Sequence, residues 1–530
     1  MHILSKKTLK NALEGKSRTR WWILMSSERR ALKQRECEER LRRMEEEGKA
    51  TRVPFQEKQK KVSQPNRKSD QQTPEEEIAE RQAMAENAAI VYRKMLPSLL
   101  KKLSKIPDPR QAKKVKHKLT VLMAFGILSF VYQVGSRRNM NKKMTKPILY
   151  ENLSTIFPEL ESIPHADTLA RLLEKIEVDE IQNCLVQLLK DLMRKKKFKN
   201  YLTNNKYLIA VDGSQKFFKN YQWAPEALKR NVGGSSQDSQ YYVYTLDSLL
   251  ILDNGIVLPV ITEILDNKDW IPGQTKQDCE SKAFKRLAPK LYEIFGKNKV
   301  ILLGDGLYAC GPVIEICNKY KWDYMLVLKE DGNQEIWSNA KGIISLEPDN
   351  RLEVLWGNRK QVYTWANDIE YDYGYCMRYT ANVNVVICIE TWTESNARST
   401  KKEEVMETRY AWISSKRLNE ENVFNRCTKI GRYRWKIENN FLIEKHEEYN
   451  FEHCFSYTWQ AMKGFHYLMK IGHFLNAMAL GSELLTDYVN RYGVRGFISK
   501  LYLALSGAVL DLVKIKEVVN SKHLWRLKAS

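Results

Sequence analysis

The feature that most limits the possible folds of this chain is a pair of apolar runs, each of which ends in Asp-Gly. The first, KYLIAVDGS, reaches Asp212, and the second, KVILLGDGLYACG, reaches Asp305. Between them, two more apolar runs are joined by Asp253-Asn254-Gly255, and Asn-Gly in such a place is a strong β-hairpin signal. A helix-like segment precedes the second run, and another helix and the strand DYMLVLK follow it. This order predicts an α/β fold, with a mixed sheet and helices on its faces.

Three acidic residues stand out against this fold. Asp212 and Asp305 are both predicted at the carboxyl ends of strands, where open α/β sheets place their sites. Glu438 lies in YRWKIENNFLIEKH, and in a helix Arg434, Glu438 and Lys445 fall within roughly 40° of one another. Taken singly, each Asp is explained as a turn or capping residue and the helix as a solvated face with an ion pair. Only the three acids together favour a functional site.

Changes of composition divide the chain into six segments. The N-terminal one is basic and poor in folding signals, and the next shows helical periodicity throughout. Short strand-like runs rich in Trp and Tyr then interrupt the α/β pattern before helices return. The predicted segments are a basic, partly disordered arm (1–72), a helical DNA-binding region (73–203), a first core part (204–329), a β-rich insertion (330–416), a second core part carrying Glu438 (417–480) and a C-terminal helical segment (481–530).

Charge and composition narrow the class of partner. The chain has 87 Lys and Arg against 64 Asp and Glu, a net charge of +23, which indicates nucleic acid or an anionic membrane surface. The longest apolar run, from Thr120 to Gly135, is shorter than the ~20 residues that span a bilayer. With no export signal and nine cysteines without a CxxC pair, we expect a cytoplasmic protein and no membrane partner. No phosphate-binding GxxxxGK[ST] loop is present, so no nucleotide is expected.

The three acids predict a metal site. Carboxylates brought close together repel unless cations lie between them, and oxygen ligands without Cys or His suit Mg²⁺ or Mn²⁺. Two such ions ~3.5–4 Å apart can activate a water or a 3′-hydroxyl for in-line attack at phosphorus. We therefore predict Asp212, Asp305 and Glu438 as catalytic metal ligands for phosphodiester cleavage and transfer, with Arg434 and Lys445 on the DNA backbone. A zinc set of Cys427, His446, His453 and Cys454 fits no common finger spacing.

The blocks VDGS, LLGDGLYA and RWKIENNFLIEK, in this order, resemble the DDE transposases of bacterial insertion sequences. Within them the chain is similar to the superfamily with a Tyr-x2-Arg-x3-Glu-x6-Lys signature and a β-rich insertion. The upstream IPDPRQAKKVKHKL and IPHADTLARLL resemble the helical region of the H-repeat-associated subgroup, so the likeness covers roughly residues 106 to 480. It departs at the signature tyrosine, which would fall at Gly431, two positions before Tyr433.

This resemblance implies an RNase H-like core and a DNA transposase. Such an enzyme binds terminal inverted repeats, cuts beside them and joins them to target DNA as a homodimer, with two Mg²⁺ or Mn²⁺ ions per site, in the bacterial cytoplasm. It also implies DNA contacts by Tyr433 and by a stacking tryptophan of the insertion, Trp356 or Trp365, although burial in a core is commoner for Trp. Two alternatives stay open: a metal-dependent nuclease without strand transfer, and a catalytically inactive DNA-binding derivative.

Overall fold

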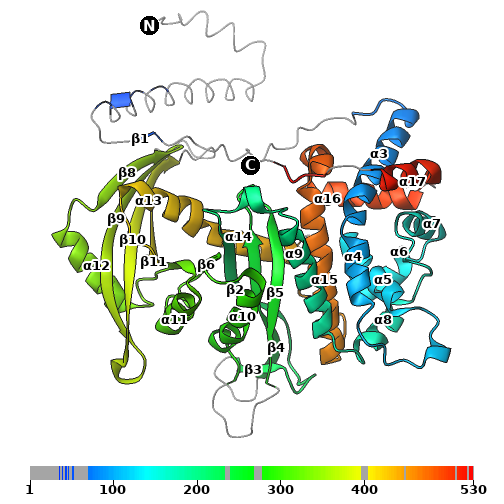
Figure 1. Ribbon diagram of the computed structural model, residues 1–530, viewed down its shortest axis with the longest axis horizontal. Helices are drawn as coiled ribbons and strands as arrows, with labels where there is room; N and C mark the ends of the chain where they lie inside the picture. The colour runs from blue at the N-terminus through cyan, green and yellow to red at the C-terminus, as the bar shows by residue number, and fades with distance from the viewer. Residues whose placement is uncertain are drawn as a thin grey trace, which may run out of the picture.

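The computed structural model (Figure 1) describes residues 70–232, 239–267, 277–394, 404–446, 449–507, 510–521 and 525–528, together with Arg35, Glu39, Arg42, Arg43, Glu46, Thr51 and Arg52. The arm predicted for residues 1–72 therefore lies almost entirely outside the described residues. In the described part, no helix is both long enough and apolar enough to cross a membrane.

The segment after the arm is helical, as predicted. Its first helix begins with Pro74 because the Thr73 hydroxyl accepts a hydrogen bond from the Glu76 N–H at 3.2 Å. The apolar run near Thr120 forms α5, which is buried. The elements are α3 (Pro74–Arg93), α4 (Leu96–Leu103), η1 (Ala112–Lys114), α5 (Leu119–Val131), α6 (Arg137–Lys143), α7 (Pro147–Ile156), α8 (Ala166–Leu173), α9 (Asp179–Arg194) and η2 (Lys199–Tyr201).

The predicted mixed sheet is confirmed. Strand β2 pairs antiparallel with β4, which pairs antiparallel with β5 through the expected hairpin, where Gly255 has φ +85°. On its other edge β2 pairs parallel with β6, and β6 pairs parallel with β7. The elements here are β2 (Tyr207–Lys219), β3 (Leu228–Asn231), β4 (Ser239–Ile251), β5 (Val257–Leu265), α10 (Glu280–Phe295), β6 (Val300–Gly304), α11 (Gly311–Tyr320) and β7 (Asp323–Val327).

The insertion strands extend this sheet instead of forming a separate one. Strand β11 pairs antiparallel with β7, with Ile413 opposite Leu326, so the order runs β1-β8-β9-β10-β11-β7-β6-β2-β4-β3. The helix α12 was not predicted; Asn333 caps it, and Ile336 and Trp337 are buried. The elements are β1 (Thr51–Arg52), α12 (Gln334–Leu346), β8 (Arg351–Trp356), β9 (Arg359–Tyr373), η3 (Tyr375–Met377), β10 (Tyr379–Glu394) and β11 (Glu404–Ser414).

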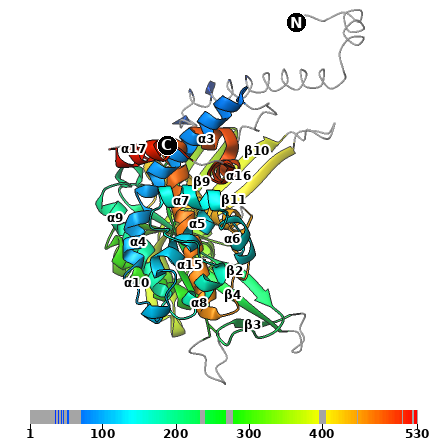
Figure 2. The same ribbon diagram turned by 90° about the vertical axis from the view of Figure 1, so that its right-hand side faces the viewer.

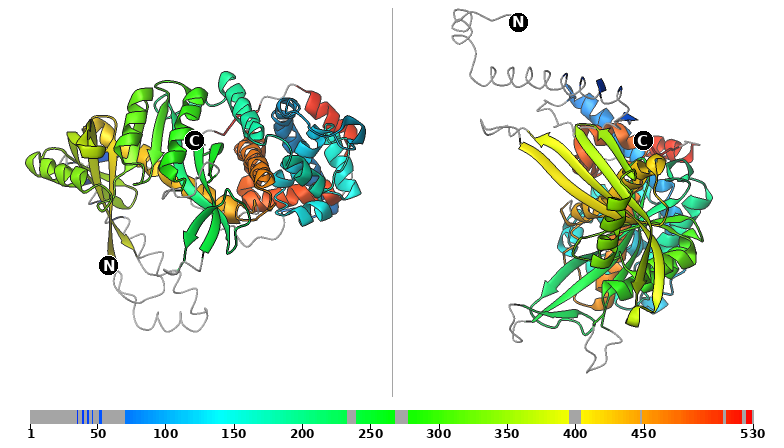
Figure 3. Two further views of the ribbon diagram at one scale, coloured as in Figure 1. Left: turned by 90° about the horizontal axis from the view of Figure 1, so that it is seen from below. Right: turned by 90° about the vertical axis from the view of Figure 1, so that its left-hand side faces the viewer.

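The C-terminal third connects the sheet to the helical region. Helix α15 stands between the sheet and α5, and the blue and red terminal helices lie together at one end of the molecule (Figures 1 and 3). A single hydrophobic cluster includes residues of the helical region, the sheet and α15. The elements are α13 (Glu420–Phe424), the π-helical turn η4 (Asn425–Ile430), the 3-10 turn η5 (Gly431–Arg434), α14 (Trp435–His446), α15 (Trp459–Leu480), α16 (Glu483–Gly507) and α17 (Leu512–Asn520).

Candidate active site

The register of β2 and β6 places the two aspartates side by side. Ala210 pairs with Leu303, the last pair between these parallel strands, and each Asp lies two residues further on. Asp305 follows the end of β6, as predicted. Asp212 does not end its strand, because β4 continues to pair with β2 as far as Lys219. The prediction that Asp212 ends a strand is therefore wrong; it lies where the parallel pairing ends.

Arg434 joins Asp212 to Glu438. Its guanidinium donates from Nη1 to Asp212 Oδ2 at 3.4 Å and from Nη2 to Glu438 Oε1. Glu438 lies in the first turn of α14, and Arg434 is the residue before that helix, so the contact spans one helical turn. The Arg434 side chain is 8% exposed, and its Nε has no hydrogen-bond partner among the described residues. Acids from β2 and α14 are thus held together by one buried cation.

Asp305 acts electrostatically on Asp212, and so belongs with the same acids. Burial raises the pKa of Asp212 to about 7, opposed by the Gly213 N–H and by Arg434, while Asp305 and Glu280 raise it further. The Asp305 carboxylate itself accepts the Leu307 N–H at 2.9 Å and lies 3.8 Å from Lys329 Nζ. Asp212 is thus partly protonated near neutral pH, and a cation beside it would favour its ionised form.

Glu280 is an acid that sequence reasoning missed. Tyr244 donates to Oε1 of its carboxylate at 2.8 Å, and Tyr308 donates to Oε2 at 2.9 Å. The carboxyl lies so close to β2 that a Cβ added at Gly213 would be 2.6 Å from Glu280 Cδ. In sequence, Glu280 is an ordinary first-turn acid of α10, and no local signal predicts that it folds back toward Asp212.

The acidic side chains are of the type that binds a divalent cation, but they are not spaced to hold one. Carboxylate oxygens are what Mg²⁺ and Mn²⁺ prefer. Yet within the described residues, no three His, Cys, Asp or Glu side chains are arranged to hold a metal ion. The same holds for the zinc ligands considered above, Cys427, His446, His453 and Cys454. At the acidic site, Asp212 and Glu438 are not arranged for an ion because the Arg434 guanidinium lies between them.

The residues predicted to contact DNA lie in different environments. Lys445 pairs with Glu452 at 3.1 Å, and its side chain is 23% exposed. Tyr433 is partly buried against a second hydrophobic cluster, and this burial raises the pKa of its phenol. That cluster includes Val354, Tyr363, Trp365, Trp412 and Ile437. Trp365 is 2% exposed inside that cluster, whereas Trp356 packs at its edge, 5.2 Å from the guanidinium carbon of Arg432.

A tryptophan outside the insertion lies against the arginine that binds two of the acids. Trp435 is 50% exposed at the start of α14, and the guanidinium carbon of Arg434 lies 4.9 Å from its ring centre. It was not among the predicted residues, because the resemblance places the stacking tryptophan in the insertion. The signal was available: Trp435 lies three residues before Glu438, so both fall on one side of a helix.

Packing leaves no room at Gly431 for the tyrosine that the resemblance would place there. A Cβ there would lie 2.9 Å from Trp412 Nε1 and 3.0 Å from Trp412 Cε2, and Trp412 is 2% exposed on β11. Even one methyl group therefore has no room without a shift of the indole.

We expect Gly431→Ala to lower the free energy of unfolding by about 1–3 kcal/mol, the usual cost of an overpacked core. Urea unfolding followed by circular dichroism measures this. Gly342→Ala is the matched control, because a Cβ at this helical glycine meets no atom of the described residues within 4 Å. This substitution should leave the free energy of unfolding unchanged or raise it. Equal stability of the two variants would contradict the close contact.

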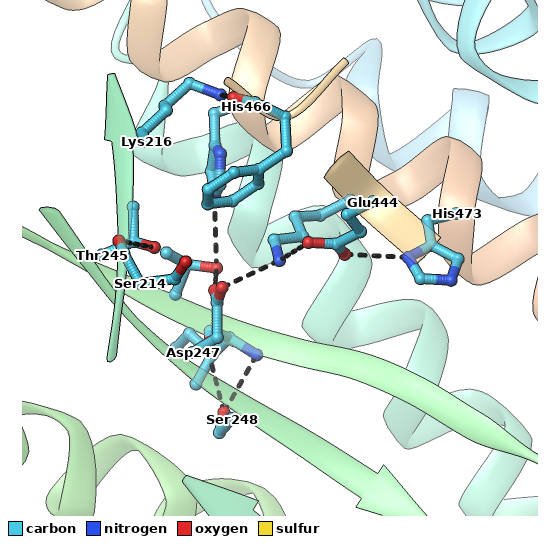
Figure 4. Close-up of polar contacts among 12 residues, drawn as sticks. Ser214, Lys216, Thr245, Asp247, Ser248, Glu444, His466 and His473 are labelled. Atoms are coloured by element: carbon cyan, nitrogen blue, oxygen red, sulfur yellow. Dashed lines mark hydrogen bonds and ion pairs between the residues drawn. The ribbon is translucent and has the colours of Figure 1, made fainter. Parts of the chain in front are cut away.

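A buried charge network fixes the other end of α14 (Figure 4). Lys470 of α15 donates to Glu444 Oε2 at 2.7 Å and to Asp247 Oδ2, on β4, at 2.9 Å. His473 Nδ1 lies 2.8 Å from Glu444 Oε1, and since a carboxylate only accepts, this nitrogen carries the proton. Burial alone would raise the pKa of Glu444, but Lys470 and His473 lower it to about 2. The helix that carries Glu438 is thereby bound to both α15 and the sheet.

Lys216 lies beside this network and predicts a pH dependence. It is 2% exposed and donates to the Phe451 carbonyl at 2.5 Å; burial, with a contribution from Lys470, lowers its pKa to about 7. Between pH 7 and 10.5 the unfolded chain binds the proton more tightly than the folded one, so stability rises with pH.

From pH 7.5 to 9.5 we expect Lys216→Met to remove about 2–3 kcal/mol of the wild-type rise in unfolding free energy, because the slope is ~1.4 kcal/mol per pH unit between the two pKa values and smaller near each of them. Urea titrations of both proteins at the two pH values measure the difference. The same slope in both proteins would show that Lys216 keeps its ordinary pKa.

Comparison with known families gives a match in the helical region. Residues 100–189, which cover the end of α4 through most of α9, match the family model described as DDE_Tnp_1-associated. No curated protein matches the chain. The match points to a DDE-type transposase family and to a transposase-related function.

Proposed function

We propose that this chain is a DNA transposase that cuts and joins the ends of an insertion sequence, with Asp212, Asp305 and Glu438 as its catalytic acids. The observation that carries the proposal is the meeting of these acids: Arg434 binds two of them, and Asp305 acts electrostatically on Asp212. The family match within the helical region supports the same class of protein. The net charge of +23 suits a DNA partner.

We propose an RNase H-like core of the subgroup with the Tyr-Arg-Glu-Lys signature and the β-rich insertion. The order β5-β4-β2-β6-β7, antiparallel on one side of β2 and parallel on the other, supports such a core. Residues 330–416 supply strands that continue its edge beyond β7.

On this proposal Asp212, Asp305 and Glu438 would hold Mg²⁺ or Mn²⁺, two ions per site. When bound, such ions supply charge stabilisation for in-line displacement at phosphorus. Arg434 must then leave at least one carboxylate, and its freed guanidinium is placed to bind a DNA phosphate. Lys445 and the exposed ring of Trp435 flank Glu438 on α14 and extend this contact. Two such chains would act together, one at each element end.

The test of the reaction uses the purified chain, Mg²⁺ and a duplex from the genomic DNA that flanks its own reading frame. A transposase yields cut ends and products joined to target DNA. A nuclease without strand transfer yields cut ends alone. Specific binding without either product would favour the inactive DNA-binding derivative.

Ion binding gives a prediction that does not depend on DNA. We expect Asp212→Asn and Asp305→Asn each to weaken Mn²⁺ binding at least about tenfold, because each removes a charged oxygen ligand. We expect Arg434→Met to bind Mn²⁺ at least as tightly as wild type, because the competing cation is gone. Isothermal titration at one pH measures all three. Weaker binding by Arg434→Met would show that the guanidinium supports the ion site instead of competing with it.

A further inference from the structure

The distal half of β2 forms a three-stranded ribbon with β3 and β4. Phe218 lies opposite Tyr242, and on the next strand Arg230 lies opposite Gln240. Beyond Ala210, β6 no longer pairs with β2, so this ribbon continues past the parallel part of the sheet. Figure 2 shows β3 and β4 projecting away from the helices.

One face of the ribbon combines rings with a cation. The guanidinium carbon of Arg230 lies 5.1 Å from the ring centre of Tyr242 and 5.9 Å from that of Phe218. Phe218 is 44% exposed, and Arg230 is exposed as well. Arg230 also donates to Gln240 Oε1 at 2.8 and 3.0 Å, and this neutral acceptor leaves its charge available.

The same face leads to Glu280: it is the face of Gly213, and the Asp212 side chain points to the opposite face of β2. The rings of Tyr242 and Tyr244 are 6.4 Å apart, and Tyr244 donates to Glu280. Glu280 binds Tyr308 and acts electrostatically on Asp212. From Asp212 to Phe218 the strand covers about 20 Å. A row of aromatic rings thus runs from the projecting ribbon to Glu280, which lies across β2 from the Asp212 side chain.

We propose that the face formed by Phe218, Arg230 and Tyr242 binds an unpaired segment of the DNA strand that enters or leaves the active site. The exposed ring of Phe218 and the half-buried ring of Tyr242 offer stacking surfaces to bases of any sequence, and a cation among them attracts the phosphates. This is the chemistry of single-strand binding surfaces. A duplex buries its base faces and could use only the charge. The inference rests on the proposed function for its choice of DNA as the nucleic acid.

The experiment measures binding of a short fluorescein-labelled oligo(dT) by anisotropy, with EDTA present so that the acids and their ions play no part. We expect Phe218→Ala and Tyr242→Leu each to weaken binding about tenfold. Tyr242→Phe, which keeps the ring, should bind like wild type. Arg230→Ala should weaken binding and reduce the salt slope by about one, and Arg230→Lys should restore the slope.

Matched controls come from another exposed loop. Tyr375 is 85% exposed and Arg378 is also exposed, both at the β9–β10 hairpin, so Tyr375→Ala and Arg378→Ala should bind like wild type. Melting temperatures report whether each variant is folded, and the exposed Arg230 gives a second readout if Phe218→Ala is unstable.

Wild-type binding by the ring variants, or no binding by wild type, would overturn the proposal. So would an equal loss of duplex binding, which would make the ribbon a duplex contact. None of these outcomes bears on Mg²⁺-dependent cleavage, so failure here is distinct from failure of the proposed function.

Discussion

Replacing Asp305 by asparagine is expected to reduce Mg²⁺-dependent DNA cleavage by at least about 10²–10³-fold, the scale seen when one group that stabilises transition-state charge is removed. Asn keeps the side-chain oxygen that accepts the Leu307 N–H, so the turn after β6 should remain folded. What is lost is one negative charge beside Asp212. Gel analysis of end-containing DNA over time measures the rate.

Asp349→Asn is the matched control for this substitution. Asp349 is exposed in the turn between α12 and β8, so the same chemical change there should leave cleavage unchanged. Glu438→Gln should behave like Asp305→Asn because it removes the acid that Arg434 holds beside Asp212. Cleavage at the wild-type rate by Asp305→Asn would remove Asp305 from the catalytic set.

The largest stability effect is expected for Lys470→Met, which should cost about 3–5 kcal/mol, the usual loss when one partner of a buried ion pair is removed. The ammonium is the link between Asp247 and Glu444, which are 1% and 0% exposed. Without it, two carboxylates remain buried, with His473 next to only one of them. Urea unfolding measures the change.

Lys463→Met is a close control because it lies two turns earlier on α15. Lys463 pairs with Asp179, whose side chain is 50% exposed, so the expected cost is within about 1 kcal/mol. The combined variant Asp247→Asn, Glu444→Gln, Lys470→Met should regain part of the loss because no unpaired charge stays buried. Equal stability of Lys470→Met and Lys463→Met would refute the charged network.

Short sequence patterns predicted much of the fold. The β4–β5 hairpin followed from Asn254-Gly255, because a tight turn between apolar runs requires a residue that tolerates positive φ. The first helix followed from Thr73, because a side-chain cap acts within one turn. Helix α12 was missed, because the strand-like runs around it outweighed the local Asn333 cap.

Only part of the candidate site could be predicted from the sequence. The sequence predicted Asp212 and Asp305 near each other at strand ends, and they do lie at one level of the sheet, but only the parallel pairing of β2 with β6 ends there, while β2 itself continues. Glu280 could not, because its approach to β2 depends on Tyr244 and Tyr308 from other elements. Trp365 and Trp356 look alike in sequence, yet one is buried and the other lies at a cluster edge.

The sequence by itself determined the order of strands and helices in the core, the hairpin, and the candidate acids on β2, after β6 and on α14. These follow from periodicity and turn chemistry, which act over a few residues. Only the tertiary structure decided that Arg434 lies between Asp212 and Glu438, that Lys470 holds α14 to the sheet, and that the insertion continues the same sheet. Burial and charge pairing across hundreds of residues depend on which surfaces meet, and no local pattern specifies that.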